Sequence, residues 1–166
     1  RDLARRDRFV EIIGNSAAGT IASVNEGIIG TSATQANAGS TYAKGKATGG
    51  TATSGVAITN AGAITSSGKG GEGIEGNTYS GASATSNYNA FGGTATSSTT
   101  ITNNTGGTII SVGDGLQGSA VALADATSAG GKGSKAVAGT ALATTLINNV
   151  ANITSSGGNG IQGFSF

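Results

Sequence analysis

The sequence predicts an all-β protein that folds as a parallel β-solenoid, also called a β-helix. Three observations predict this class. A unit of about 44 residues recurs along the 166-residue chain, and self-similarity at a fixed period is typical of repeat architectures. The units are rich in glycine and in β-branched residues, which favour short strands and tight turns over helices. Proline is absent, as expected of strands that are hydrogen-bonded on both sides.

The composition excludes several classes of function. The chain has no cysteine and no histidine, which excludes disulfides, the usual zinc ligands and Cys/His or Ser/His nucleophile pairs. A net charge of +1 gives no reason to expect a nucleic-acid partner. No apolar run is long enough to span a membrane. Because the chain lacks methionine, we expect a processed product or a segment of a longer protein.

Residues 1–11 differ from the rest of the chain because they hold many of its charges. Leu3 falls near Phe9 or Val10 on one helical face. We interpret this segment as a short N-terminal cap or linker, with a helix as one expected conformation, since the end of a solenoid exposes unpaired strand edges.

Residues 12–166 form the predicted solenoid, with repeats at roughly 12–55, 56–99, 100–145 and 146–166. Three apolar tracks recur once per repeat and predict aliphatic stacks inside the solenoid. The tracks are Ile13, Ile58, Ile101 and Ile147; Ile21, Ile64, Ile109 and Ile153; and Ile28, Ile74, Leu116 and Ile161.

An asparagine follows two residues after each member of the first track. These residues are Asn15, Asn60, Asn103 and Asn149. Asparagine suits turn conformations, and stacked side-chain amides can hydrogen-bond along a column. We therefore expect a structural asparagine ladder.

Each repeat has two unlike halves. One carries the isoleucine tracks, and the other alternates alanine with small polar residues, as in 119–126. We expect two coils of about 22 residues per repeat, one with an isoleucine core and one with an alanine core. A single wide coil of about 44 residues is the alternative.

Glu26, Glu72 and Asp114 occur at matching places in successive repeats. Stacked carboxylates among glycines are weak candidates for calcium ligands, and the main expectation is a solvated turn with no cofactor. Glu72 and Glu75 form the one close acid pair within a repeat. On a strand they would point to opposite faces, so we predict that the protein is not an enzyme.

Aromatic residues are few and suggest two other roles. Tyr42, Tyr79, Tyr88 and Phe91 could stack on sugar rings, although isolated surface aromatics are the main expectation. Phe164 and Phe166 follow the last isoleucine without a polar cap, and we predict that they take part in self-assembly.

The phrase Ile-x-Asn-x-Gly-x-Ile-x-Ser followed by Gly-Ile-x-Gly, clearest over 58–66 and 73–76, resembles the repeats of bacterial autotransporter passengers and filamentous-haemagglutinin-type adhesins. The resemblance covers the isoleucine-rich halves. It implies a right-handed β-helix at the bacterial cell surface that acts in adhesion, aggregation or biofilm formation.

The leading functional hypothesis is therefore a non-catalytic extracellular module. It would be part of an adhesin stalk, with flanking repeats as partners, or a subunit that stacks end to end into a filament. The alternative is a glycan- or calcium-binding solenoid, and a polysaccharide-acting enzyme is the third hypothesis.

Overall fold

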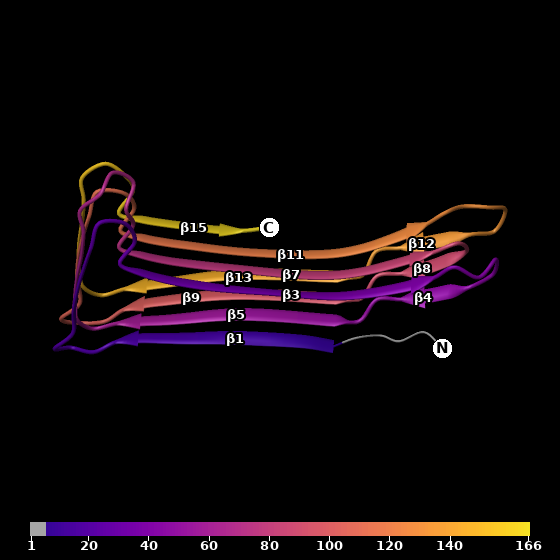
Figure 1. Cartoon of the computed structure of the whole chain (residues 1–166), viewed down its shortest axis with the longest axis horizontal. Coiled ribbons are helices and arrows are strands. Elements are labelled where there is room, and N and C mark those ends of the chain that lie inside the picture. Colours follow the sequence, from indigo (N-terminus) through magenta and orange to yellow (C-terminus); the bar gives the residue numbers. More distant parts are fainter. Residues whose placement is uncertain (1–5) are drawn as a thin grey trace.

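The computed structural model describes residues 6–166 and shows an all-β column of stacked coils (Figure 1). Sheet A contains β1 (Arg6–Asn15), β5 (Thr51–Asn60), β9 (Thr94–Asn103) and β13 (Thr140–Asn149). Sheet B contains β2 (Thr20–Ser23), β6 (Ala63–Ser66), β10 (Thr108–Ser111) and β14 (Asn152–Ser155). Sheet C contains β3 (Ile28–Ser40), β7 (Ile74–Ser86), β11 (Leu116–Ser128) and β15 (Ile161–Ser165). Sheet D contains β4 (Lys46–Thr48), β8 (Asn89–Phe91) and β12 (Lys135–Val137).

All strand pairs in these sheets are parallel, and each strand pairs with its equivalent in the next repeat. Ile13 lies opposite Ile58, which lies opposite Ile101, which lies opposite Ile147. This in-register stacking confirms the predicted parallel β-solenoid. We number the coils 1 (6–50), 2 (51–93), 3 (94–139) and 4 (140–166).

Each repeat forms one wide coil, so the expectation of two coils per repeat is wrong and the single-coil alternative is right. Ala36 of β3 pairs with Ala82 of β7 and then with Ala124 of β11, one whole repeat apart each time. A coil of 22 residues would need a corner within each of these strands, but β3 and β7 each run for 13 residues.

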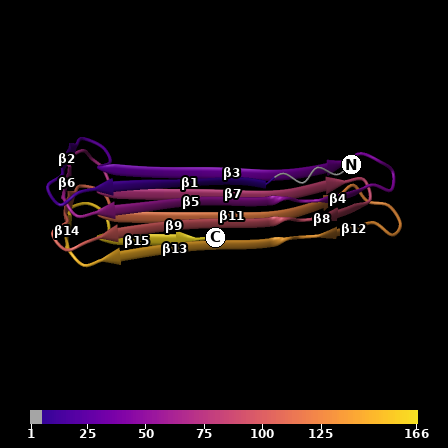
Figure 2. The same cartoon turned by 90° about the horizontal axis from the view of Figure 1, so that it is seen from below.

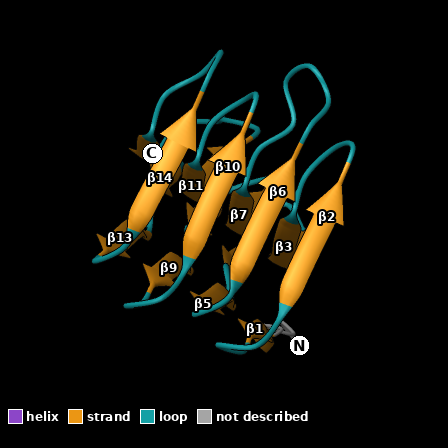
Figure 3. Ribbon diagram, turned by 90° about the vertical axis from the view of Figure 1, so that its left-hand side faces the viewer, coloured by secondary structure: helices purple, strands orange, loops and turns teal. Residues whose placement is uncertain are grey.

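The wide coil is strongly flattened. The long strands of sheets A and C run along its two broad sides, with sheet B at one end and sheet D at the other (Figure 2). Figure 3 looks onto sheet B, which closes its end between the two broad sheets. Small inward side chains allow the two broad sides to lie close together, and this explains why the alanine-rich half belongs to the same coil as the isoleucine-rich half.

The interior changes along the length of the coil. Near sheet B the three apolar tracks form one buried cluster, in which Ile58, Ile64, Ile74, Ile101, Ile109 and Leu116 are almost completely buried. Towards sheet D the interior is made of alanines, including Ala38, Ala47, Ala84 and Ala90. The predicted isoleucine and alanine cores therefore lie side by side in every complete coil.

Between these apolar regions, buried hydroxyl groups link sheets A and C. The Ser54 and Ser80 hydroxyl oxygens lie 2.8 Å apart, and those of Thr78 and Thr99 lie 3.0 Å apart. Thr99 also donates to the Ser119 carbonyl oxygen at 2.7 Å. Because these buried polar groups have partners, they hold the two sheets together without the cost of an unsatisfied hydroxyl.

The segment predicted as an N-terminal cap or linker begins the solenoid itself. β1 starts at Arg6 and pairs with β5 over its whole length, from Arg6 opposite Thr51 to Asn15 opposite Asn60. The helical expectation is therefore wrong for residues 6–11, because pairing with the next coil outweighs local helical periodicity. Residues 1–5, including Leu3, lie outside the described residues. Over residues 6–166, no helix is long and apolar enough to cross a membrane.

Candidate functional site

The predicted asparagines lie in one column, at the junction of sheets A and B. Asn15 Nδ2 donates to Asn60 Oδ1, Asn60 to Asn103 and Asn103 to Asn149, each at 2.8 Å. Asn60 and Asn103 are completely buried. Every bond points in the same direction, so the ladder has an acceptor end at coil 1 and a donor end at coil 4.

The donor end of the ladder lies at an open end of the column. Asn60 uses its two amide hydrogens for Gly62 O, at 3.0 Å, and for the next asparagine. Asn149 makes the equivalent of the first bond, to Ala151 O at 2.9 Å, and has no further asparagine above it among the described residues. An added coil with an asparagine at this place would extend the ladder.

The apolar columns are open at the same end. Ile74 and Leu116 are completely buried in coils 2 and 3, but Ile161, their equivalent in coil 4, is 49% exposed. Ile147 and Ile153 are only half-buried. β15 also pairs with only the first part of β11. The coil-4 end therefore presents strand edges together with the uncovered tops of the core columns.

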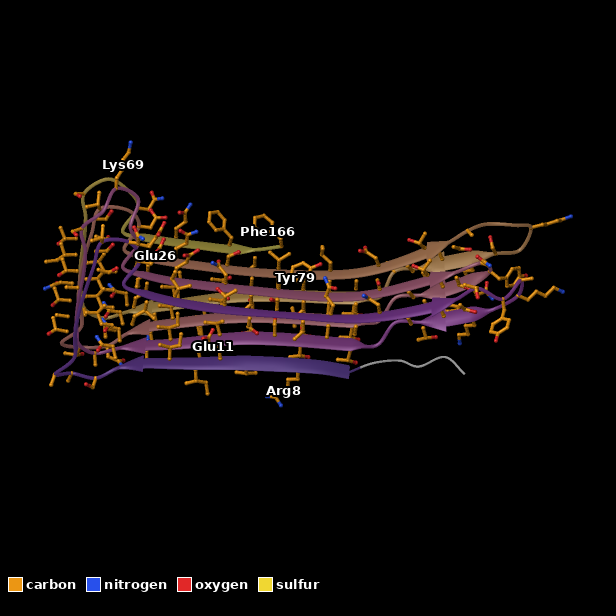
Figure 4. The ribbon with its side chains drawn as sticks, viewed as in Figure 1. Arg8, Glu11, Glu26, Lys69, Tyr79 and Phe166 are labelled. Carbon is orange, nitrogen blue, oxygen red and sulfur yellow. The ribbon has the colours of Figure 1, made fainter. Side chains whose placement is uncertain are left out.

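The coil-1 end differs because it carries a charged residue in an inward position. Glu11 lies opposite Val56, a buried residue of coil 2, and its carboxylate accepts the Thr31 N–H at 2.7 Å (Figure 4). An inward charge is one of the features that prevents edge-to-edge pairing of β-strands. Glu11 is not among the residues predicted from the sequence, although its spacing of two from Ile13 places it in the inward phase.

Phe164 and Phe166, predicted to take part in self-assembly, do not lie among the core columns at the coil-4 end. The register places Phe164 opposite Ser119, an outward position of β11. Phe166 is 72% exposed, and the two rings stack with centroids 6.1 Å apart. They therefore lie on the outer face of sheet C, and the end surface is built from the isoleucines and Asn149.

The acidic residues are grouped differently from the predicted calcium set. Glu26, Glu72 and Asp114 do follow one another in register. However, the carboxylate oxygens of Glu26, Glu72 and Glu75 are those that come within 4.8 Å of one another. Asp114 instead accepts the Asn159 N–H at 2.5 Å. Calcium binds six to eight oxygens. The three carboxylates of this group could supply at most six of them, and only if each bound through both oxygens.

The expectation that Glu72 and Glu75 point to opposite faces is wrong. Glu72 precedes β7, which begins at Ile74, so the alternation of a strand does not apply to it. Partial burial raises the pKa of the Glu72 carboxyl, and the nearby carboxylates of Glu75, Glu26 and Asp114 raise it further, against a lowering backbone hydrogen bond. When ionised, the Glu72 carboxylate is therefore repelled by these neighbouring carboxylates, and this repulsion destabilises the folded state.

Replacing Glu72 with glutamine is expected to stabilise the protein at neutral pH. A raised pKa means that the folded state binds the proton more tightly, so stability falls as pH rises from the ordinary glutamate pKa through the raised one. The expected gain at pH 7 is about 0.5 kcal/mol, or about 1–2 °C in melting temperature. The gain should disappear below the ordinary glutamate pKa.

Thermal unfolding of the wild type and of Glu72→Gln, monitored by circular dichroism at pH 7 and at a pH below the ordinary glutamate pKa, measures the difference in melting temperature. Asp125→Asn, which removes a carboxylate outside the cluster, is the control and should change the melting temperature little at either pH. Calcium or a chelator should leave the wild-type midpoint unchanged. A calcium-dependent rise that Glu72→Gln abolishes would contradict the expectation that no cofactor binds there.

No protein-family model, curated protein sequence or solved structure matches this chain.

Proposed function

We propose that this chain is a non-catalytic extracellular structural module of an adhesive stalk or filament, extended by coils that stack on its coil-4 end. The open end of the hydrogen-bonded column is the observation that carries the proposal. It combines exposed edges of β13, β14 and β15 with uncovered Ile147, Ile153 and Ile161. An edge of this kind is a template for further strand pairing.

A coil added at this end would gain the interactions that already join coils 2 and 3. Its strands would pair with the free edges of sheets A, B and C, and its isoleucines would cover those of coil 4. Complete burial of one isoleucine stabilises by about 1.5–3 kcal/mol. Burial of three isoleucine columns, together with one more hydrogen bond of the asparagine ladder, therefore strongly favours the addition of a coil at this end.

The next coil can come from flanking repeats of a longer chain or from coil 1 of a second copy. In the second case, Asn15 of the second copy would accept from Asn149, and Ile13 would cover Ile147. However, its Glu11 would lie over Thr145, because Glu11, Val56, Thr99 and Thr145 share one inward column. Burying this carboxylate is costly, so flanking repeats are the favoured extension and stacking of separate copies is weak.

Head-to-tail contact between unlike ends does not close on itself, so stacked copies would form a filament. The resemblance to exported adhesin repeats supports a location at the bacterial cell surface and a role in adhesion. The interior consists of aliphatic and small polar side chains, which suits a spacer more than a reaction site.

Electron microscopy and light scattering at rising protein concentration test this assembly. Glu11→Gln removes the charge that opposes stacking, so it should form rods at concentrations where wild type is mainly monomeric. Adding Ile161→Lys, which puts a charge on the coil-4 end, should return Glu11→Gln to monomers. Adding Ile110→Lys instead, at an exposed outward position of β10 in coil 3, is the matched control and should leave the rods of Glu11→Gln intact.

Discrete monomers of Glu11→Gln at every concentration would overturn end-to-end stacking. Rods that persist with Ile161→Lys would show that assembly uses another surface.

A further inference from the structure

A shallow hollow lies on the outer face of sheet C, in the middle of the long strands. Its volume is about 260 Å³, and it is lined by side chains from β3, β7 and β11. Gly81 occupies its centre, between Gln35 on one side and Leu123 on the other. Because glycine has no side chain, the space above it is available to the side chain of a neighbouring residue.

Tyr79 provides the aromatic surface of the hollow. A β-carbon at Gly81 would lie 3.1 Å from the Tyr79 hydroxyl oxygen and 3.3 Å from a ring carbon, so the ring leans along its own strand over the glycine. The ring is half-buried and lies midway along the broad face (Figure 4). The absence of a side chain at Gly81 thus leaves room for the Tyr79 ring above the strand.

Three polar side chains line the same hollow as this ring. Asn37, Ser83 and Asp125 form one column across three coils, and the Ser83 hydroxyl donates to Asn37 Oδ1 at 2.8 Å. This bond uses the amide oxygen of Asn37, and its Nδ2 group can donate to a ligand. The hollow therefore offers an amide donor, Asn37, on its β3 side and a carboxylate acceptor, Asp125, on its β11 side, together with one aromatic ring.

We propose that this hollow binds one ring of a neutral glycan, with the sugar stacked on Tyr79. The face of an aromatic ring is partially negative and attracts the C–H groups of a sugar ring. Sugar hydroxyls both donate and accept, which matches the adjacent Asn37 amide and Asp125 carboxylate. The Asp125 charge disfavours acidic sugars. The hollow is slightly smaller than the usual ligand pocket of about 300–1,000 Å³, which suits a single sugar ring.

This site is independent of the end-to-end stacking proposed above, because it lies on the side of the column. A shallow, half-open site is expected to bind a single sugar weakly, with a Kd of about 1 mM. Ala33 and Val121 lie opposite Tyr79 in the neighbouring coils, so sheet C carries this aromatic surface in coil 2 and not in coils 1 and 3.

The test uses methyl glycosides of neutral hexoses as probes, with galacturonic acid as the acidic comparison. Saturation-transfer NMR detects contact with the sugar. Titration of the Tyr79 ring resonances, to about 20 mM sugar, measures the affinity. At least one neutral hexose should shift these resonances, and galacturonic acid should not.

Tyr79→Ala should weaken binding at least tenfold, as followed by saturation transfer, and Tyr79→Phe should keep most of it because the ring remains. Gly81→Ala should also weaken binding, because its methyl group would displace the ring. Tyr42→Ala is the matched control: Tyr42 is 78% exposed, lies outside the hollow and should have no effect. Circular dichroism checks that each variant is folded.

The proposal fails if no neutral hexose shifts Tyr79, or if Tyr79→Ala and Tyr42→Ala reduce the signal equally. Tight binding of the acidic sugar alone would overturn the assignment to neutral glycans.

Discussion

Replacing Gly93 with alanine is expected to destabilise the protein by about 3 kcal/mol or more. Gly93 lies where sheet D passes into sheet A, and a β-carbon there would collide with the Gly50 carbonyl oxygen and with Gly49, all backbone atoms of the coil below. Backbone atoms cannot rotate away as a side chain can, so coils 1 and 2 would have to separate locally. Urea denaturation followed by circular dichroism measures the loss of stability.

Gly160→Ala is the matched control for this substitution. A β-carbon at Gly160 meets no atom within 4 Å, and its backbone conformation is one that alanine can adopt. We expect a change within about 0.5 kcal/mol, with a small gain from the less flexible unfolded chain. Equal losses at the two positions would show that close stacking of the coils does not require glycine at 93.

Replacing Asn60 with alanine is expected to lower the free energy of unfolding by about 3 kcal/mol or more. Asn60 is completely buried, accepts from Asn15, donates to Asn103 and bonds both backbone groups of Gly62. Its removal leaves several buried donors and acceptors unsatisfied, and each costs about 1–3 kcal/mol. The midpoint of urea denaturation should fall sharply, with an unchanged slope if the folded state stays compact.

Asn15→Ala tests whether the effect comes from the middle of the ladder. Asn15 is only partly buried and has one neighbour in the ladder, Asn60. Its replacement should cost about 1 kcal/mol. A loss at Asn15 as large as that at Asn60 would mean that the cost reflects the local turn rather than the buried column.

Several parts of the fold follow from the sequence because they repeat in phase. The isoleucine tracks and the asparagine column depend only on which residue of one coil lies above its equivalent in the next. In-register parallel pairing makes that correspondence visible as a period. The strand class likewise follows from β-branched residues, glycine and the absence of proline.

The number of residues in one coil could not be predicted from the period of the repeat. Alternation of inward and outward residues tells which side chains face the interior, but not which strand lies across from them. Ser54 and Ser80 are 26 positions apart, yet their hydroxyls meet inside the coil. Small side chains fit equally well in a narrow triangular coil, so only the path of the turns selects the flat one.

The candidate sites also differ in whether they could be predicted from the repeat. The sequence alone determined the repeat, the strand class and the columns, since stacking identical residues is a local, periodic property. Only the tertiary structure decided that Glu75 joins Glu26 and Glu72, that Glu11 occupies an inward position at the coil-1 end and that Asn37, Tyr79 and Asp125 line one hollow. These groupings depend on turns and on side-chain directions across neighbouring coils, where different residues occupy equivalent places and no period reveals them.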